Sequence, residues 1–382
     1  MVAPCPTAPV RARPPEAPLR RTARPRPLAA LVLVAVLGVL VPGLVGVVPV
    51  GPGAGGGATV AAAAPSWPVP QPFPVSSDPP ERLTDLPLGS EYVALGDSYS
   101  AGYGLADPSH LPTNACAQSA RDYPHRIAAR FGLALTDVTC AGATSTDVVS
   151  GHQFHGVPPQ ISALSDSTRL VTLTIGGNDA DLFGTAASCL ALSAKGPVFS
   201  GRDAPSCEST FVRDGEDQLA TRIDSRVALG IATTLARIRQ AAPNAIVVFL
   251  GYPAIFPDTE HTPERGCFRS AVDLATLAGS FPTNSYPFTD TDVAYLHDVQ
   301  ARLDTVSADA ARAAGVRFVD VFASTQARSA CATERPYVAG VSLDGSGDLQ
   351  RIDMRPGALH PNERGVAYLA KRVASAVRSL AG

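Results

Sequence analysis

Five short apolar runs punctuate the chain after residue 90, separated by stretches with helical spacing of their apolar positions. Continuous apolar runs of this length predict strands that are buried on both faces. Strands that alternate with helices predict a parallel sheet with helices packed against it. The sequence therefore predicts an α/β domain with five buried parallel strands, at residues 92–95, 133–139, 170–175, 245–250 and 316–321.

Three later segments carry apolar residues three and four positions apart, which is the spacing of one helix face. The first covers 219–238 and stops before Pro243. The second covers 293–313 and ends at Gly315, a residue type that commonly closes a helix. Asn362 opens the third, since its side-chain oxygen can cap free backbone N–H groups. Each apolar face is expected to lie on the sheet.

Two segments, 180–215 and 252–290, fit neither the strand period nor the helix period. Each contains cysteines together with several Gly or Pro residues. Long loops inside a compact domain are usually functional or held by cross-links. We therefore expect these segments to form the walls of a site.

The first 90 residues differ in composition from the rest. Residues 1–27 are rich in Pro and Arg, 28–50 are almost wholly apolar, and 58–64 are small residues. This order is typical of an export signal. The apolar run is also long enough to remain as a membrane anchor, and Arg20-Arg21 permits a twin-arginine route, although the flanking residues fit that route poorly. We expect a signal peptide or N-terminal membrane anchor at 1–64, a Pro-rich linker at 65–90 and the folded domain at 91–382.

The net charge of the predicted exported part of the chain argues against two classes of binding partner, nucleic acids and anionic lipids. Without the six Arg and one Glu of residues 1–64, the chain's 31 basic and 34 acidic residues fall to 25 and 33, a formal charge of −8. An acidic exported domain is a poor candidate for binding nucleic acid, whose phosphates require a basic face. It also offers no polybasic surface to anionic lipids.

Six of the seven cysteines lie in the predicted domain. An even number in an exported chain predicts three disulfides, and six cysteines allow 15 pairings. The sequence contains no C-x-x-C pair, so a zinc site is not expected.

Candidate chemistry lies where predicted strands end. The strand 92–95 leads directly into Gly96-Asp97-Ser98, which places Ser98 at the edge where parallel sheets hold their active sites. Asn178 follows the strand 170–175, and its amide can donate to a developing oxyanion. Gly142 follows the strand 133–139 and offers a bare backbone N–H. His360 lies just before the last helix, and Pro361 restrains its backbone.

The four segments around Ser98, Gly142, Asn178 and His360, in this order and spacing, resemble the SGNH (GDSL) hydrolases over roughly residues 91–380. The resemblance implies a flavodoxin-like three-layer α/β/α sandwich, with Ser98 as nucleophile and His360 as general base. It further implies an oxyanion hole made by the N–H groups of Ser98 and Gly142 and the side chain of Asn178. The segments around Cys116 and Cys140 look most like secreted actinobacterial lipases and esterases, whose cysteines pair in sequence order, here Cys116–Cys140, Cys189–Cys207 and Cys267–Cys331.

One position departs from the family pattern. Most members carry an acid three residues before the histidine, where this chain has Gly357. A carbonyl oxygen can accept the same hydrogen bond from the imidazole Nδ1 atom. We therefore predict that the backbone carbonyl of Gly357 orients His360, with Asp353 as a weaker substitute.

Several other polar residues have simpler interpretations. Asp97 and Asp179 are expected to hold turns or caps, and His152 and His155 to lie in a solvated loop and not at a metal. The run 289–292 is expected to cap a helix. His125 has no evident partner, so a surface or packing role is expected.

We thus expect a secreted, monomeric carboxylic ester hydrolase (lipase or esterase) that needs no metal or cofactor. It acts on small-molecule or lipid esters, with transient contact to lipid surfaces, and is either free or tethered through 28–50. A carbohydrate deacetylase or a phospholipase on the same site is the alternative within enzymes, because loops and not motifs select the acyl group. A cell-surface binding protein that has lost turnover is the alternative from another class.

Overall fold

The computed structural model describes residues 80–199, 204–273, 275–276, 280–345 and 352–382. The predicted signal peptide or anchor at 1–64 and residues 65–79 of the predicted linker lie outside these described residues. Within the described part of the chain, no helix is both long enough and apolar enough to cross a membrane.

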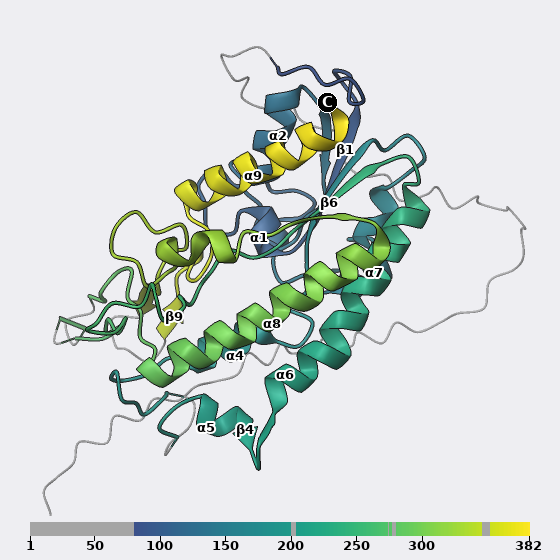
Figure 1. The fold of residues 1–382 in the computed structure, drawn as a ribbon. Helices are drawn as coiled ribbons and strands as arrows, with labels where there is room; N and C mark the ends of the chain where they lie inside the picture. The colour runs from purple at the N-terminus through teal and green to yellow at the C-terminus, as the bar shows by residue number, and fades with distance from the viewer. Residues whose placement is uncertain (1–79, 200–203, 274, 277–279, 346–351) are drawn as a thin grey trace, which may run out of the picture. The chain divides into compact units, whose positions relative to one another are not determined.

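Five strands form one parallel sheet, as the apolar runs predict (Figure 1). The strand order is β2-β1-β3-β6-β7, and every neighbouring pair is parallel. Because parallel strands end at the same edge, the segments that follow β1, β2 and β3 are brought together there. The bounds are β1 (Glu91–Gly96), β2 (Ala134–Asp137), β3 (Leu170–Thr174), β6 (Ile246–Leu250) and β7 (Arg317–Val319).

The sheet is buried on both faces, which explains why its strands read as continuous apolar runs. Along β1, Val93 and Leu95 belong to one apolar cluster, whereas Tyr92 and Ala94 belong to a second one on the opposite face. Successive strand residues point to opposite faces, so the two clusters are the two cores of a three-layer sandwich. The predicted flavodoxin-like α/β/α fold is therefore confirmed.

Helices cover both faces of the sheet. Figure 1 shows α2 beside α9 on one side and α7 beside α8 on the other, and these pairs are in contact. The bounds are α1 (Ser98–Ala101), α2 (Tyr123–Phe131), α3 (Ser145–Val149), α4 (Leu182–Ser188), α5 (Glu208–Phe211), α6 (Gln218–Arg222), α7 (Ala228–Ala241), α8 (Asp290–Ala314) and α9 (Glu363–Ala381).

Short elements complete the domain. Two antiparallel hairpins lie outside the main sheet. They are β4 (Val212–Arg213) with β5 (Glu216–Asp217), and β8 (Leu343–Gly345) with β9 (Ile352–Met354). Short helical segments lie at η1 (Asn114–Cys116), η2 (Gln160–Ala163), η3 (Ile223–Val227) and η5 (Ala323–Arg328).

The predicted helix boundaries are confirmed by their caps. Asn362 accepts hydrogen bonds from the N–H groups of Arg364 and Gly365 at the start of α9. Thr289 caps α8 through the Asp292 N–H, as expected for the run 289–292. At the other end of α8, Gly315 adopts the left-handed conformation (φ 63°).

The predicted helix over 219–238 is interrupted by a π-helical turn, η3, between α6 and α7. Leu219, Ile223, Val227 and Ile231 are spaced by four and are all fully buried. A spacing of four drifts away from the 3.6-residue period of an α-helix, and one wider turn brings these side chains back toward the sheet.

The three disulfides pair in sequence order, which confirms the pairing implied by the resemblance: Cys116–Cys140, Cys189–Cys207 and Cys267–Cys331. The prediction that 180–215 lacks regular structure was wrong in part, because α4 and α5 lie within it. Helices of seven and four residues are too short to show a helical period in the sequence.

Residues 80–90 lie against the folded domain. The Glu81 N–H donates to the Arg130 carbonyl (2.8 Å), and the Asp85 N–H donates to the Ala381 carbonyl (3.1 Å). Leu86 is buried in the core shared by α2 and α9. This part of the Pro-rich segment therefore follows the surface as a strap.

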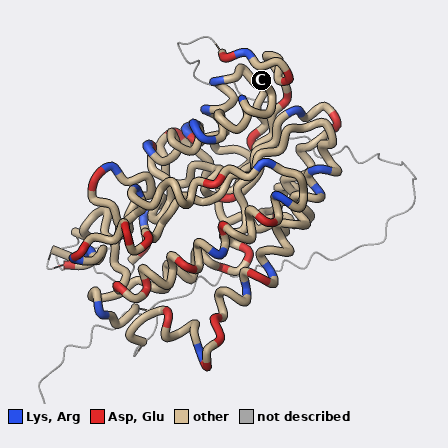
Figure 2. The backbone as a smooth tube through the Cα atoms, in the orientation of Figure 1, with Lys and Arg blue, Asp and Glu red and all other residues tan. Residues whose placement is uncertain are grey.

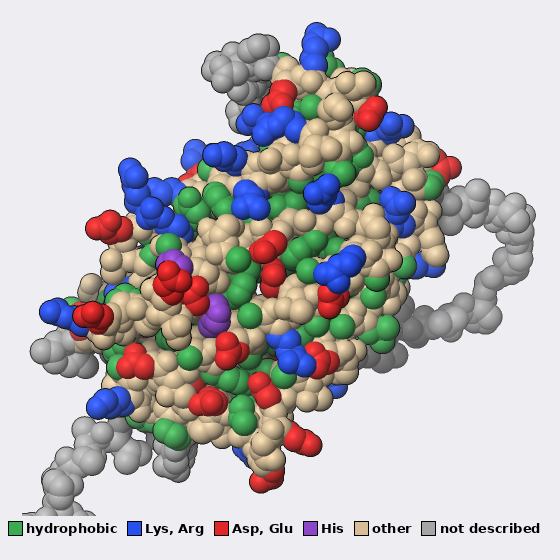
Figure 3. Space-filling view, in the orientation of Figure 1, with side chains coloured by type: hydrophobic (Ala, Val, Ile, Leu, Met, Phe, Trp, Pro, Cys, Tyr) green, Lys and Arg blue, Asp and Glu red, His purple; other side chains and the backbone are tan. Residues whose placement is uncertain are grey.

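Charged positions of both signs are interspersed along the backbone (Figure 2). On the face shown in Figure 3, acidic side chains are most numerous over the half that carries α8, while Lys and Arg lie mainly over the half that carries α9. The face in view is therefore of mixed sign.

Candidate active site

The predicted site residues converge at the carboxyl edge of the sheet. Ser98 is the first residue of α1, and only Asp97 separates it from the end of β1. Gly142 lies in the turn after β2, and Asn178 lies in the turn after β3. The Asn178 amide donates to the carbonyl of Ala143, next to Gly142, at 3.0 Å. His360 precedes α9 and reaches Ser98, so residues up to 262 positions apart meet at one place.

Ser98 and His360 are in direct contact. The Nε2 atom of His360 lies 2.7 Å from Ser98 Oγ, and the two residues are 3% and 9% exposed, respectively. Asp97 caps α1 by accepting the Tyr99 N–H at 2.9 Å, which fixes the turn that presents Ser98. This contact has the geometry of a nucleophile beside its general base.

The group that orients His360 is the carbonyl of Ala358, so the prediction of Gly357 was wrong by one residue. The Nδ1 atom of His360 lies 2.8 Å from the Ala358 oxygen. The Gly357 carbonyl instead accepts the backbone N–H of His360 at 3.1 Å. Leu359 adopts φ 60°, a left-handed conformation unusual for leucine, and this turns the Ala358 carbonyl toward the ring. Asp353 is exposed in the β8–β9 hairpin.

Three aromatic rings surround the His360 imidazole, at centroid distances of 4.7 Å for Tyr99, 5.1 Å for Tyr103 and 4.9 Å for Phe183. Burial disfavours the charged imidazolium and lowers the pKa of His360 to about 4, although the hydrogen bond to Ala358 acts in the opposite direction. The imidazole is therefore neutral at pH 7 and able to accept a proton.

Tyr99 ties the serine turn to the histidine loop. Its hydroxyl donates to the Leu359 carbonyl at 2.6 Å, while its ring packs on His360. Tyr99 follows Ser98 and Leu359 precedes His360, so this hydrogen bond holds the two segments that carry Ser98 and His360 together.

Candidate oxyanion donors lie on the turns that follow β1, β2 and β3. Within the described residues, the backbone N–H groups of Ser98 and Gly142 have no hydrogen-bond acceptor. Gly142 has φ 83°, a conformation that favours glycine. Asn178 uses one amide hydrogen on the Ala143 carbonyl and keeps the second. These are the three donors that the resemblance assigns to an oxyanion hole.

Two supporting residues were missed by sequence reasoning. Tyr252 donates to Asp97 and accepts the Gly177 N–H, and its position just after β6 was a usable signal. Gln160 holds both the N–H (2.7 Å) and the carbonyl (3.0 Å) of Gly96 at the end of β1. No pattern in the sequence pointed to Gln160, because its partner lies 64 positions away.

The two acids beside the motifs have structural roles, as predicted. Asp97 caps α1, and burial raises its pKa to about 7. Asp179 accepts the Ser145 N–H at 3.1 Å at the start of α3. Burial raises the pKa of Asp179 as well.

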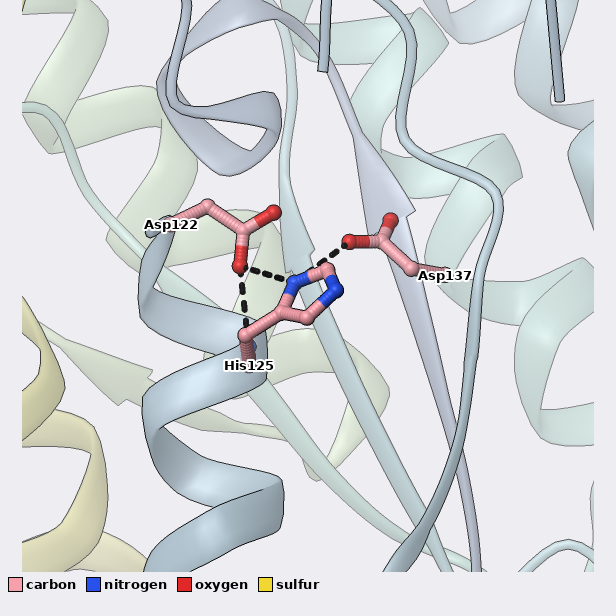
Figure 4. A group of neighbouring side chains, drawn as sticks. All are labelled: Asp122, His125 and Asp137. Carbon is pink, nitrogen blue, oxygen red and sulfur yellow. Dashed lines mark hydrogen bonds and ion pairs between the residues drawn. The ribbon is translucent and has the colours of Figure 1, made fainter. Parts of the chain in front are cut away.

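A second buried polar cluster, formed by Asp122, His125 and Asp137, lies between α2 and β2 (Figure 4). The His125 Nδ1 atom is 2.6 Å from Asp122 Oδ1 and 3.5 Å from Asp137 Oδ2, so His125, for which the sequence showed no partner pattern, is buried beside two acids. Among the described residues, the Oδ2 atoms of both acids are buried without a hydrogen-bond donor.

Burial raises the pKa of Asp122 to about 7 and that of Asp137 well above its usual range, and lowers the pKa of His125. These residue types can bind a metal ion, but Nδ1 is already hydrogen-bonded to Asp122. His152 and His155 are not part of any such cluster in the described chain.

Comparisons with known proteins agree with this geometry. The model of the GDSL-like Lipase/Acylhydrolase family matches residues 94–368. Lipase 2 of Streptomyces coelicolor is 37% identical over 243 residues, which cover 63% of this chain and 72% of the lipase.

Two solved structures share the fold. One is phospholipase A1 from Streptomyces albidoflavus and the other an extracellular lipase from Streptomyces rimosus. Each is 23% identical, with a TM-score of 0.53 over 75% of this chain; 99% of the phospholipase chain and 100% of the lipase chain are covered. This protein therefore belongs to the GDSL-like Lipase/Acylhydrolase family, as an ester hydrolase of the lipase and esterase class.

Proposed function

We propose that the protein hydrolyses carboxylic esters through an acyl-enzyme on Ser98, with His360 as general base. The observation that carries this proposal is the 2.7 Å contact between His360 Nε2 and Ser98 Oγ in a buried setting. A serine hydroxyl is a weak nucleophile until a neighbouring base accepts its proton. The lowered pKa of His360 keeps that base neutral.

In the first half-reaction, Ser98 Oγ forms a bond to the ester carbonyl carbon while its proton moves to His360 Nε2. The carbonyl electron pair moves onto the oxygen. When this tetrahedral intermediate collapses, the bond to the alcohol oxygen breaks, and the alcohol leaves with the proton from His360. Ser98 then carries the acyl group as an ester.

In the second half-reaction, His360 accepts a proton from water as the water oxygen attacks the acyl carbon. Collapse of the second tetrahedral intermediate breaks the bond to Ser98 Oγ, which regains a proton from His360. The products are a carboxylic acid and the free enzyme, and no metal or cofactor takes part in the proposed cycle.

The oxyanion of each intermediate is proposed to bind the N–H groups of Ser98 and Gly142 and the second amide hydrogen of Asn178. In the described structure, these two backbone donors have no other acceptor. Preorganised donors of this kind each contribute about 3 to 4 kcal/mol to transition-state stabilisation. Because a neutral carbonyl orients His360, the reaction depends more on these donors than it does in enzymes with a buried acid.

The proposed substrate is a fatty-acyl ester. Phe183 contacts His360, and Leu182 and Phe183 both pack against the larger apolar core, so the wall from α4 is apolar. Leu192 and Phe199, in the loop closed by Cys189–Cys207, are 49% and 40% exposed and are suited to transient contact with a lipid surface. The similar proteins include a lipase and a phospholipase A1.

We further propose that the protein is exported. Three disulfides are typical of oxidising compartments, and one similar solved structure is an extracellular lipase. The signal-like order of residues 1–64 supports the same conclusion. N-terminal sequencing of the protein recovered from the culture medium of its host tests this, and a chain found only in the cell membrane with residue 1 intact would contradict it.

Hydrolysis of p-nitrophenyl acetate, butyrate and palmitate tests the substrate proposal. We expect turnover of all three by the oxidised protein, with kcat/KM highest for a chain longer than acetate. Strict preference for acetate would favour a deacetylase. A folded protein that is inactive on all three would contradict simple ester hydrolysis and favour the binding protein.

A further inference from the structure

Tyr252 links the two turns that follow the neighbouring strands β1 and β3, beyond the last paired residues Gly96 and Thr174. It lies two residues after β6 and is 8% exposed. Its hydroxyl donates to Asp97 Oδ2 at 2.5 Å and accepts the Gly177 N–H at 2.9 Å. Because the strand order is β1-β3-β6, the phenol spans the end of β3 to reach Asp97 beyond β1.

Both partners of the Tyr252 hydroxyl stand next to proposed catalytic groups. Asp97 precedes Ser98, and its other carboxylate oxygen accepts the Tyr99 N–H at 2.9 Å. Gly177 precedes Asn178. Through two hydrogen bonds, the hydroxyl therefore connects the turn that carries Ser98 to the turn that carries Asn178.

The ring of Tyr252 is also in contact with the serine turn. It packs edge-on against Tyr99 at 4.9 Å, and Tyr99 in turn packs on His360. Burial and the negative charge of Asp97 raise the pKa of Tyr252 well above its usual range, so the hydroxyl remains a donor.

We propose that Tyr252 is a positioning residue that fixes the Ser98 N–H and the Asn178 amide relative to each other. The inference rests on the proposed function, since it assigns these groups to one oxyanion hole. Donors stabilise a developing oxyanion only when their positions are set before the reaction. Strand pairing holds the two turns together up to Gly96 and Thr174, and the Tyr252 hydroxyl adds a connection beyond that point, directly beside Ser98 and Asn178.

The substitution Tyr252→Phe removes the hydroxyl and keeps the ring. We expect kcat to fall about tenfold to hundredfold and KM to change by less than about twofold, because substrate still binds while the donors are misplaced. Tyr92→Phe is the matched control. Its hydroxyl is also buried, in a 2.7 Å hydrogen bond with Thr172 Oγ1 in the sheet, so this variant should lose thermal stability while kcat remains unchanged.

Asp97→Asn disturbs the same link from its other end and provides a second test if Tyr252→Phe fails to fold. If both residues act through one link, the double variant should lose little more kcat than the more damaging single variant. The inference would be overturned if the losses of kcat in the two single variants multiplied in the double variant. It would also be overturned if Tyr252→Phe kept kcat within about twofold of the parent, or if only its KM changed.

The parent protein and Ser98→Ala are assayed first. A parent without Ser98-dependent turnover would contradict the proposed function, whereas an active parent with an equally active Tyr252→Phe variant would contradict only the role of Tyr252.

Discussion

The carbonyl oxygen of Ala358 accepts the Nδ1 proton of His360 at 2.8 Å, only two residues away along the chain. A backbone group thus occupies the position that an acid holds in most members of the family. A carbonyl orients the ring and selects its tautomer, but it carries no formal charge to stabilise the imidazolium.

Asp353→Ala should keep kcat/KM for p-nitrophenyl butyrate within about twofold of the parent, because the imidazole already has its acceptor in Ala358. Steady-state kinetics of both proteins provide the measurement. A loss of a hundredfold or more in a folded variant would instead make Asp353 part of the catalytic group.

The pH dependence of kcat/KM should reflect the buried histidine. Only the neutral imidazole accepts the serine proton, and burial lowers the pKa of His360 to about 4. Activity should therefore persist well below pH 6.5 and decline as the pH falls through about 4. A pH–rate profile with its acidic midpoint at or above the ordinary histidine pKa would contradict the buried, neutral base.

Removing the Cys116–Cys140 disulfide should reduce both stability and activity. Cys140 lies two residues before Gly142, and the Ala141 N–H donates to the Cys116 carbonyl at 2.9 Å, so the cross-link supports the turn of a proposed oxyanion donor. Replacing both cysteines by alanine should cost about 3 kcal/mol of unfolding free energy and lower kcat. The matched variant without Cys267–Cys331 should lose stability with a smaller effect on kcat, and equal kcat losses in the two variants would argue against this role.

The free energy of unfolding of Asp122→Asn, relative to that of the parent, should be highest at high pH. Burial raises the pKa of Asp122 to about 7 in the folded state, whereas an unfolded aspartate has a pKa of about 3.9. The folded state therefore binds more protons between these values, and the stability of the parent should fall as the pH rises through this window. Asparagine keeps the helix cap without the charge. Urea unfolding at pH 5 and pH 8 measures the difference, and a relative stability that falls with pH would contradict the raised pKa.

The sheet could be predicted from the sequence because strands that are buried on both faces form continuous apolar runs. Every residue of β3 is buried, and its apolar run stands out from polar neighbours. The contact between Ser98 and His360 was predictable from motifs placed at the ends of predicted elements. The identity of the orienting carbonyl was not, because the choice between Gly357 and Ala358 depends on the left-handed conformation of Leu359.

The partners of the supporting side chains were missed for a different reason, although the position of Tyr252 after β6 placed it at the same edge of the sheet. Tyr252 meets Asp97 across 155 residues, and Asp137 joins the local pair Asp122 and His125 only when α2 packs beside β2. Such contacts depend on side-chain geometry in the folded domain, and no local spacing encodes them. The π-helical turn before α7 likewise follows from the need to keep one apolar face on the sheet.

The central claim is that Ser98 carries the acyl group. The most direct measurement is mass spectrometry of peptides from the oxidised protein after reaction with a fluorophosphonate probe. We expect one adduct, located on Ser98, and the loss of both this adduct and ester hydrolysis in Ser98→Ala. A folded protein that hydrolyses esters but remains unlabelled at Ser98, or that keeps its activity in Ser98→Ala, would contradict it.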